Sequence, residues 1–116
     1  MLLRVEMVGG VAVMTMMDTK LDATNQDDFL RELDPVLQKT ARLVLDLERV
    51  DFVDSTGCST LLKTVALVRG QKGDLKICAS RPRIHDTFTL VGLHRTCDLF
   101  ATVAEGVAAY AAGNER

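Results

Sequence analysis

Aromatic and basic residues are both scarce in this sequence of 116 residues. It contains no tryptophan, one tyrosine and four phenylalanines, and its 14 lysines and arginines are outnumbered by 16 aspartates and glutamates, which leaves a net charge of −2. Proteins that bind nucleic acids neutralise phosphates with clustered basic side chains and stack bases on aromatic rings. The composition therefore argues against DNA or RNA as a partner.

Long apolar runs and paired cysteines are also missing. Arg4, Glu6 and two glycines interrupt the apolar residues at the start of the chain, and no other segment offers about 20 consecutive apolar residues. The three cysteines, Cys58, Cys78 and Cys97, are an odd number without a C-x-x-C pair, which indicates reduced thiols. We expect a cytoplasmic protein that does not insert directly into a membrane.

Strand-like and helix-like segments alternate along the chain. Residues 2–8 and 11–17 have strand patterns, and Gly9-Gly10 between them predicts a tight antiparallel hairpin. Later strands are predicted at 42–48, 74–80 and 97–103. Helices are predicted at 21–40, from the sequence DSTG at 54–57 to Gly70 or Gly73, at 82–93 and at 104–113. This order predicts one α/β domain over residues 1–112, a mixed sheet backed by helices, and a frayed tail at 113–116.

Two of the predicted helices carry more specific expectations. In the first, Asp22 or Thr24 is placed to cap the start, and Pro35 predicts a kink or a restart because proline removes a backbone hydrogen bond. The second has apolar side chains at helical spacing, so that one face is expected to be buried. That face consists of Cys58, Leu61, Leu62, Val65 and Val68.

Motifs for catalysis and cofactor binding are absent. The sequence has no G-x-x-x-x-G-K-[ST] loop, no G-x-S-x-G elbow and no paired histidines or cysteines at metal-ligand spacing. His85 and His94 are the only candidate bases for a serine hydrolase. DSTG at 54–57 is similar to the D-[ST]-G sequence of aspartic proteases but has an extra residue, and the helices contradict an all-β protease. We predict no enzymatic activity, no catalytic residue, no metal and no cofactor.

The polar sequence Asp54-Ser55-Thr56-Gly57 stands where a buried strand ends and a helix begins, a position at which open α/β sheets often keep their sites. One explanation is structural: Asp54 or Ser55 caps the helix, and Gly57 permits a close approach of the chain. The other is a phosphorylation site, because a helix amino end accommodates phosphate. Asp51 and Asp54 would then add to the negative charge and repel a docked partner. The tetrapeptide alone leaves both explanations open.

Three segments resemble STAS domains of the anti-sigma-factor antagonist type. LVLDLERVDFVDSTGCSTLL at 43–62 is similar to the family's signature, and TKLDATNQDDF at 19–29 to its G-x-L-D-A-x-T loop. LVGLHRTCDLFATVAEGVAAY at 90–110 resembles the closing segment of the family. The likeness follows the right order over nearly the whole chain, which makes it more specific than DSTG. It implies a single STAS-like α/β domain, with a mixed β-sheet and helices packed mainly on one face.

The resemblance also assigns roles by position. Ser55 matches the serine that a partner anti-sigma kinase phosphorylates, Asp54 matches the preceding acid, and Asp22 matches the acid of the earlier loop. Asp22 as a simple cap and Thr56 as a second phosphate acceptor remain open. The partner-binding residues implied are Asp22, Asp54, Ser55, Thr56 and Gly57.

Two residues depart from the family pattern. Lys20 stands where the family usually has glycine, which alters the loop or the partner's footprint. Cys58 stands where an aliphatic residue is usual after Gly57. Its place at a helix amino end favours a lowered thiol pKa, whereas its place on the inner face of the helix favours a packed, inert thiol.

The function implied by the resemblance is that of a bacterial, cytoplasmic partner-switching protein. The unmodified form binds an anti-sigma serine kinase, phosphorylation of Ser55 ends that binding, and a serine phosphatase of the metal-dependent type restores it. The alternative is a constitutive STAS subunit of a transporter or a signalling scaffold, which needs no phosphorylation.

Overall fold

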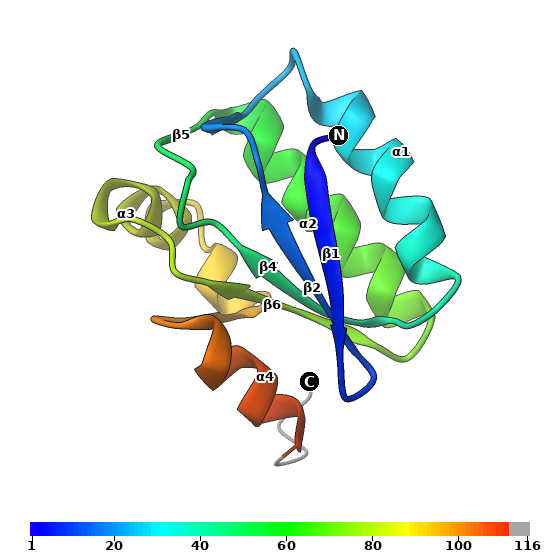
Figure 1. The fold of residues 1–116 in the computed structure, drawn as a ribbon. Helices are drawn as coiled ribbons and strands as arrows, with labels where there is room; N and C mark the ends of the chain where they lie inside the picture. The colour runs from blue at the N-terminus through cyan, green and yellow to red at the C-terminus, as the bar shows by residue number, and fades with distance from the viewer. Residues whose placement is uncertain (112–116) are drawn as a thin grey trace.

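The fold is built on a five-stranded sheet with the strand order β1-β2-β4-β6-β7, as the computed structural model of residues 1–111 shows (Figure 1). The first two strands are antiparallel, and the remaining neighbours are parallel. The strands are β1 (Leu3–Val8), β2 (Val11–Met16), β4 (Arg42–Asp46), β6 (Asp74–Cys78) and β7 (Asp98–Phe100). The mixed sheet is therefore confirmed.

The hairpin between β1 and β2 forms where it was predicted. Val8 pairs with Val11, and the two residues between them, Gly9 and Gly10, have φ values of 55° and 82°. Positive φ at both central residues is what a tight two-residue hairpin turn requires, and glycine adopts it without a steric penalty.

Helices cover the sheet unequally. The helices α1 (Gln26–Leu37), α2 (Ser55–Gly70) and α3 (Pro82–Leu90) and the short 3₁₀ helix η1 (Leu93–Arg95) contribute to one large core, whereas α4 (Val103–Ala111) packs on the opposite face (Figure 1). Alternate residues of β4 face the two layers, as the strand period of two requires. Leu43 and Leu45 join the large core, and Val44 joins a smaller core with Tyr110. The expected arrangement, with helices mainly on one face, is confirmed.

Some predicted boundaries differ from the structure. The segment 97–103 is a strand only from Asp98 to Phe100, and the helix expected at 82–93 ends at Leu90 before a separate 3₁₀ turn. The predicted domain boundary at 112, the end of the last helix at 113 and the tail at 113–116 lie outside the described residues.

Pro35 does not restart the first helix. It lies inside α1, which runs as one element to Leu37. Because the helix ends two residues after Pro35, the missing backbone donor affects only its last turn. The expected restart is therefore wrong.

The buried face of α2 is rotated relative to the prediction. Cys58, Leu61, Val65 and Val68 are buried as expected, but Leu62 is 42% exposed, and Thr60 and Thr64 are buried instead. Each threonine hydroxyl donates to the backbone carbonyl four residues earlier at 2.9 Å. The Thr60 hydroxyl also lies 3.3 Å from the side-chain oxygen of Gln26 on α1. A helix packed against both the sheet and α1 needs this wider buried face, and satisfied hydroxyls can occupy it.

The apolar face of β1 is less buried than its alternating pattern predicted. Leu3 is 2% exposed, whereas Val5 is 40% and Met7 is 45% exposed. β1 is an edge strand, and Glu32 of α1 receives hydrogen bonds from the backbone of Leu2 and Leu3 at its beginning, whereas Val5 and Met7 line an open groove beside Pro35 and Val36.

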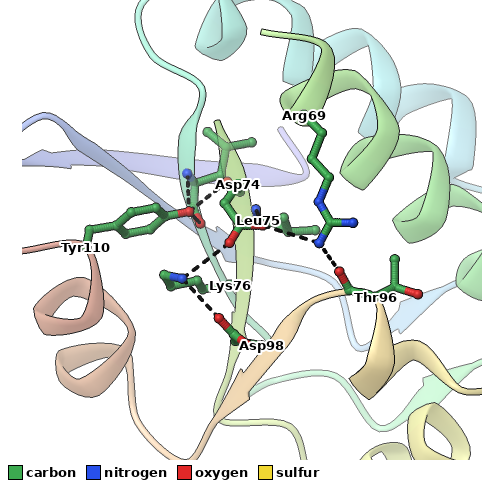
Figure 2. A network of polar contacts seen from close by, with 8 residues as sticks. Arg69, Asp74, Leu75, Lys76, Thr96, Asp98 and Tyr110 are labelled. Carbon is green, nitrogen blue, oxygen red and sulfur yellow. Dashed lines mark hydrogen bonds and ion pairs between the residues drawn. The ribbon is translucent and has the colours of Figure 1, made fainter. Parts of the chain in front are cut away.

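A polar network joins β6 to its neighbours inside the fold (Figure 2). The Lys76 ammonium group is fully buried and lies 3.3 Å from Asp74 and 3.2 Å from Asp98. It also lies 4.6 Å from the centre of the Tyr110 ring on α4, a cation–π distance. The Tyr110 hydroxyl is 2.8 Å from the carbonyl oxygen of Leu43 and 2.7 Å from that of Asp74, so the network fixes α4 to both central strands.

Candidate functional site

Two short strands bring the loop of residues 19–25 beside the DSTG sequence. β3 (Lys20–Leu21) and β5 (Phe52–Val53) form a separate parallel pair, in which Leu21 is opposite Val53. Asp22 and Asp54 directly follow these paired residues. Two of the segments that carry the resemblance are therefore neighbours in space, although about 30 residues separate them in the chain.

Gly57 makes this close approach possible. A Cβ atom added at Gly57 would collide with the backbone carbonyl oxygen of Leu21 and lie 2.7 Å from Cγ1 of Val53. Real Cβ atoms essentially never come so near to other heavy atoms. The structural role predicted for Gly57, permission for a close contact of the chain, is confirmed.

The start of α2 divides its functions among neighbouring residues. Asp54 is the N-cap, and its carboxylate accepts the backbone N–H of Gly57 at 2.8 Å. Ser55 is the first residue of the helix and is exposed, whereas Thr56 is half-buried. Because Asp54 supplies the cap, the hydroxyl of Ser55 is not needed for it.

Asp22 organises the turn ahead of α1. Its carboxylate accepts from the backbone N–H of Thr24 at 2.9 Å and from the Thr24 hydroxyl at 2.5 Å. The side-chain oxygen of Asn25 accepts a hydrogen bond from the backbone N–H of Asp22 at 3.0 Å. The N-cap of α1 is Asn25, which makes no side-chain capping bond, so Asp22 caps the preceding turn and not the helix itself.

Negative charge surrounds Ser55 in the folded chain. The hydrogen bonds from the hydroxyl and then the backbone of Thr24, helped by the Lys20 ammonium group 3.9 Å away, lower the pKa of Asp22. Asp22 is therefore a carboxylate at neutral pH, and Asp51 and Asp54 are the acidic residues of the second segment. A phosphate on Ser55 would join acids from two segments of the chain.

Phe52 is a surface feature that the sequence pattern did not reveal. It is 51% exposed and lies in β5, opposite Lys20. A two-residue strand is too short to show a period of two, so its exposed position was not predictable. Exposed aromatic side chains are enriched where proteins bind one another, which makes Phe52 an addition to the candidate surface.

Cys58 is a packed thiol and not a reactive one. Burial, followed by the carboxylate of Asp54, raises the pKa of the Cys58 thiol. Cys78 and Cys97 are also buried and free, and burial raises the pKa of Cys78 to about 12. The explanation of Cys58 as a thiol with lowered pKa is wrong, because the rise in pKa caused by desolvation of the thiolate outweighs the lowering expected at a helix amino end.

The two histidines considered as candidate bases lie in different elements. His85 is exposed and His94 is half-buried, in α3 and η1 respectively. Within residues 1–111, no cluster of three or more histidine, cysteine or acidic side chains is placed to hold a metal ion. None of the helices in this part of the chain is both long and apolar enough to span a bilayer.

Comparison with known sequences supports the resemblance. A model of the STAS domain matches residues 3–106. The chain is 29% identical over 73 residues to BtrV of Bordetella bronchiseptica, a candidate anti-sigma factor antagonist, and this match spans 62% of this chain and 63% of BtrV. It is 28% identical over 88 residues to the anti-sigma-B factor antagonist of Bacillus subtilis, and this match covers 76% of this chain and 81% of that protein.

Solved structures share the fold. An anti-sigma factor antagonist from Mycobacterium paratuberculosis superposes with a TM-score of 0.83 at 25% identity, over 92% of this chain and 91% of that one. The murine anion transporter Slc26a9 contains a similar domain, with a TM-score of 0.80 at 17% identity over 92% of this chain and 18% of the transporter. On the match of the family model to residues 3–106, this chain belongs to the STAS domain family.

Proposed function

We propose that this protein is an anti-sigma-factor antagonist that binds an anti-sigma serine kinase when Ser55 is unmodified. The observation that carries the proposal is the exposed hydroxyl of Ser55 at the first position of α2, within the segment that resembles the family signature. Relatives named as anti-sigma factor antagonists support the same role.

The proposed reaction is phosphoryl transfer to Ser55, catalysed by the kinase. The Ser55 Oγ attacks the γ-phosphorus of ATP, the bond from that phosphorus to the β–γ bridging oxygen breaks, and ADP leaves. The hydroxyl proton passes to a base on the kinase. A metal-dependent serine phosphatase would hydrolyse the phosphoserine with water and restore the hydroxyl and free phosphate.

Phosphorylation would end binding through charge. A phosphoserine carries about −1.5 to −2 charges at neutral pH. It would stand next to Asp54 and near Asp51, and the one lysine of the adjoining short strand, Lys20, already lies close to Asp22. A partner fitted to the unmodified surface, including exposed Phe52, would meet a new cluster of like charge.

Binding measurements with Ser55 variants test the proposal. Ser55→Ala is expected to bind the kinase whether or not ATP is present, and Ser55→Asp to bind at least about tenfold more weakly than the unmodified protein. Ser59→Ala is the matched control, because Ser59 is also exposed on α2, one turn later. This control should bind like wild type and be released by ATP like wild type.

The constitutive-subunit alternative predicts a different result. A STAS subunit that needs no phosphorylation would bind its partner equally well as wild type, Ser55→Ala and Ser55→Asp. That outcome, with all three proteins folded by circular dichroism, would contradict the switch.

A further inference from the structure

The two edges of the sheet differ in length and exposure. β7 has three residues, whereas β1 has six, and every residue of β1 after Leu3 is exposed. An exposed strand edge presents unpaired backbone groups that can add a further strand. β1 contains no proline or bulge to prevent this, and its only charges are Arg4 and Glu6, which have opposite signs.

Alternate residues of β1 direct their backbone groups away from the sheet. Val8 and Val11 flank the two-residue turn as a pair, and the N–H of Met17 donates to the carbonyl of Leu2 at 2.8 Å. The backbone N–H and C=O groups of even-numbered residues of β1 therefore bond to β2. Those of odd-numbered residues point away from the sheet at its open edge. Consistently, the N–H of Leu3 leaves the sheet and donates to Glu32 of α1 at 2.9 Å.

One register of a second copy suits this edge. If two β1 strands pair antiparallel about Val5, then Val5 is opposite Val5 of the second copy and Arg4 is opposite its Glu6. Centring the pair on Arg4 or on Glu6 would instead place like charges opposite each other, which destabilises cross-strand pairs. Pairing about Val5 matches both the outward backbone groups and the signs of the charges.

Apolar side chains support the same register. Leu3, Val5 and Met7 line a groove of about 240 Å³ beside Pro35 and Val36 of α1. Pairing about Val5 would place Leu3 opposite Met7 of the second copy, all on the helix-covered face of the sheet. The exposed parts of Val5 and Met7 would then be buried against their counterparts.

We propose that β1 is a homodimerisation edge, through which two copies of this chain pair antiparallel about Val5 into one continuous sheet. Backbone bonds would join Val5 to Val5 of the second copy in both directions. The Met7 N–H would donate to the Leu3 carbonyl of the other copy, while Glu32 keeps the Leu3 N–H. The interface is self-complementary, so it closes at a dimer. The proposal does not depend on the role of Ser55.

Charge reversal tests the register in sedimentation velocity over a range of protein concentrations. The wild-type chain is expected to show a monomer–dimer equilibrium. Arg4→Glu or Glu6→Arg alone places like charges opposite each other twice in the dimer and should raise its Kd about tenfold or more. The double variant Arg4→Glu/Glu6→Arg restores opposite charges and should return the Kd to within about threefold of wild type.

Arg49→Glu is the matched control for Arg4→Glu, because Arg49 is exposed and lies outside β1, and the substitution changes the net charge by the same amount. It should dimerise like wild type, and Val5→Pro, which removes the central outward N–H, should remain monomeric. Circular dichroism must show that every variant is folded. A wild-type protein that is monomeric up to about 0.5 mM, single reversals without effect, or a double variant no better than the single ones would each overturn the proposal.

Discussion

At the residue scale, the start of α2 separates structural from functional duties. Asp54 caps the helix and Gly57 admits the Leu21 carbonyl, so the fold makes no demand on the Ser55 hydroxyl. An exposed side chain without a structural duty can be modified, or replaced by alanine, without loss of the fold. This separation is what a reversible chemical switch at Ser55 would need.

Gly57→Ala is expected to destabilise the protein by about 1–3 kcal/mol, because the added methyl group collides with the Leu21 backbone and with Val53. Gly70→Ala is the control. Gly70 ends the same helix, and an added Cβ atom there meets nothing within 4 Å. It should be neutral or slightly stabilising. Urea unfolding of both variants checks this. An equal loss of unfolding free energy in the two variants would show that α2 does not need the close contact.

The cysteines should resist alkylation in the folded protein. Burial raises the pKa of Cys78 to about 12 and also raises that of Cys58. Thiolate is the reactive form, so raising the pH from 7 to about 9.5, across the ordinary thiol pKa, should leave both thiols unlabelled until the chain unfolds. Iodoacetamide labelling read by peptide mass spectrometry measures this. Rapid labelling of Cys58 in folded protein at pH 7 would show a reactive thiol after all.

Several residues of the site were predictable from the sequence, and others were not. The cap at Asp54 and the close contact at Gly57 follow from residue type and position alone. The bonds of Asp22 to Thr24 and the exposure of Phe52 depend on β3 and β5, which have two residues each. Strands that short leave no periodic signal, so their pairing appears only in the folded structure.

At the element scale, α4 is held to the sheet by polar as well as apolar contacts. Its Tyr110 hydroxyl reaches carbonyl oxygens of β4 and β6, and its ring lies over the Lys76 ammonium group (Figure 2). Lysine side chains are rarely fully buried unless they are paired with an opposite charge. Lys76 is buried here because Asp74 and Asp98 neutralise it.

Tyr110→Phe should destabilise the protein by about 1–3 kcal/mol, since it leaves buried carbonyl groups of two strands without the hydroxyl while the ring stays in place. The N–H of Leu43, which donates to the same hydroxyl at 3.1 Å, also loses that acceptor. Thermal and urea unfolding measure the change. A variant as stable as wild type would mean that the hydroxyl contributes nothing to the docking of α4.

Lys76→Met should cost about 3 kcal/mol or more, because Asp74 would remain fully buried without the ammonium group. The control is Lys63→Met, which removes an exposed lysine from α2 and should change stability by less than about 0.5 kcal/mol. Chemical unfolding of both proteins makes the comparison. Equal stability of the two variants would contradict a stabilising role for the buried ion pairs.

Elements with long periodic patterns were predicted best. The hairpin at Gly9-Gly10, β4 and β6 form within their predicted segments, since glycine pairs and continuous aliphatic runs are strong local signals. The restart at Pro35 and the burial of Leu62 were wrong predictions, because the tolerance of a proline near a helix end and the direction of a buried face depend on packing.

At the scale of the whole molecule, the proposed switch and the proposed dimer use different parts of the fold. The switch surface lies on β3, β5 and the start of α2, and the dimer edge lies on β1. The charge reversals at Arg4 and Glu6 should therefore leave kinase binding unchanged. Isothermal titration of the double variant with the kinase measures this, and a large loss of affinity would show that the two surfaces are coupled.

The most direct test of the central claim is peptide mass spectrometry of the protein isolated from its native cells under several growth conditions. The account predicts a phosphate on Ser55 that is present in some conditions and absent in others, with none on the exposed neighbour Ser59. A chain that never carries phosphate on Ser55 would contradict the switch and favour a constitutive STAS subunit.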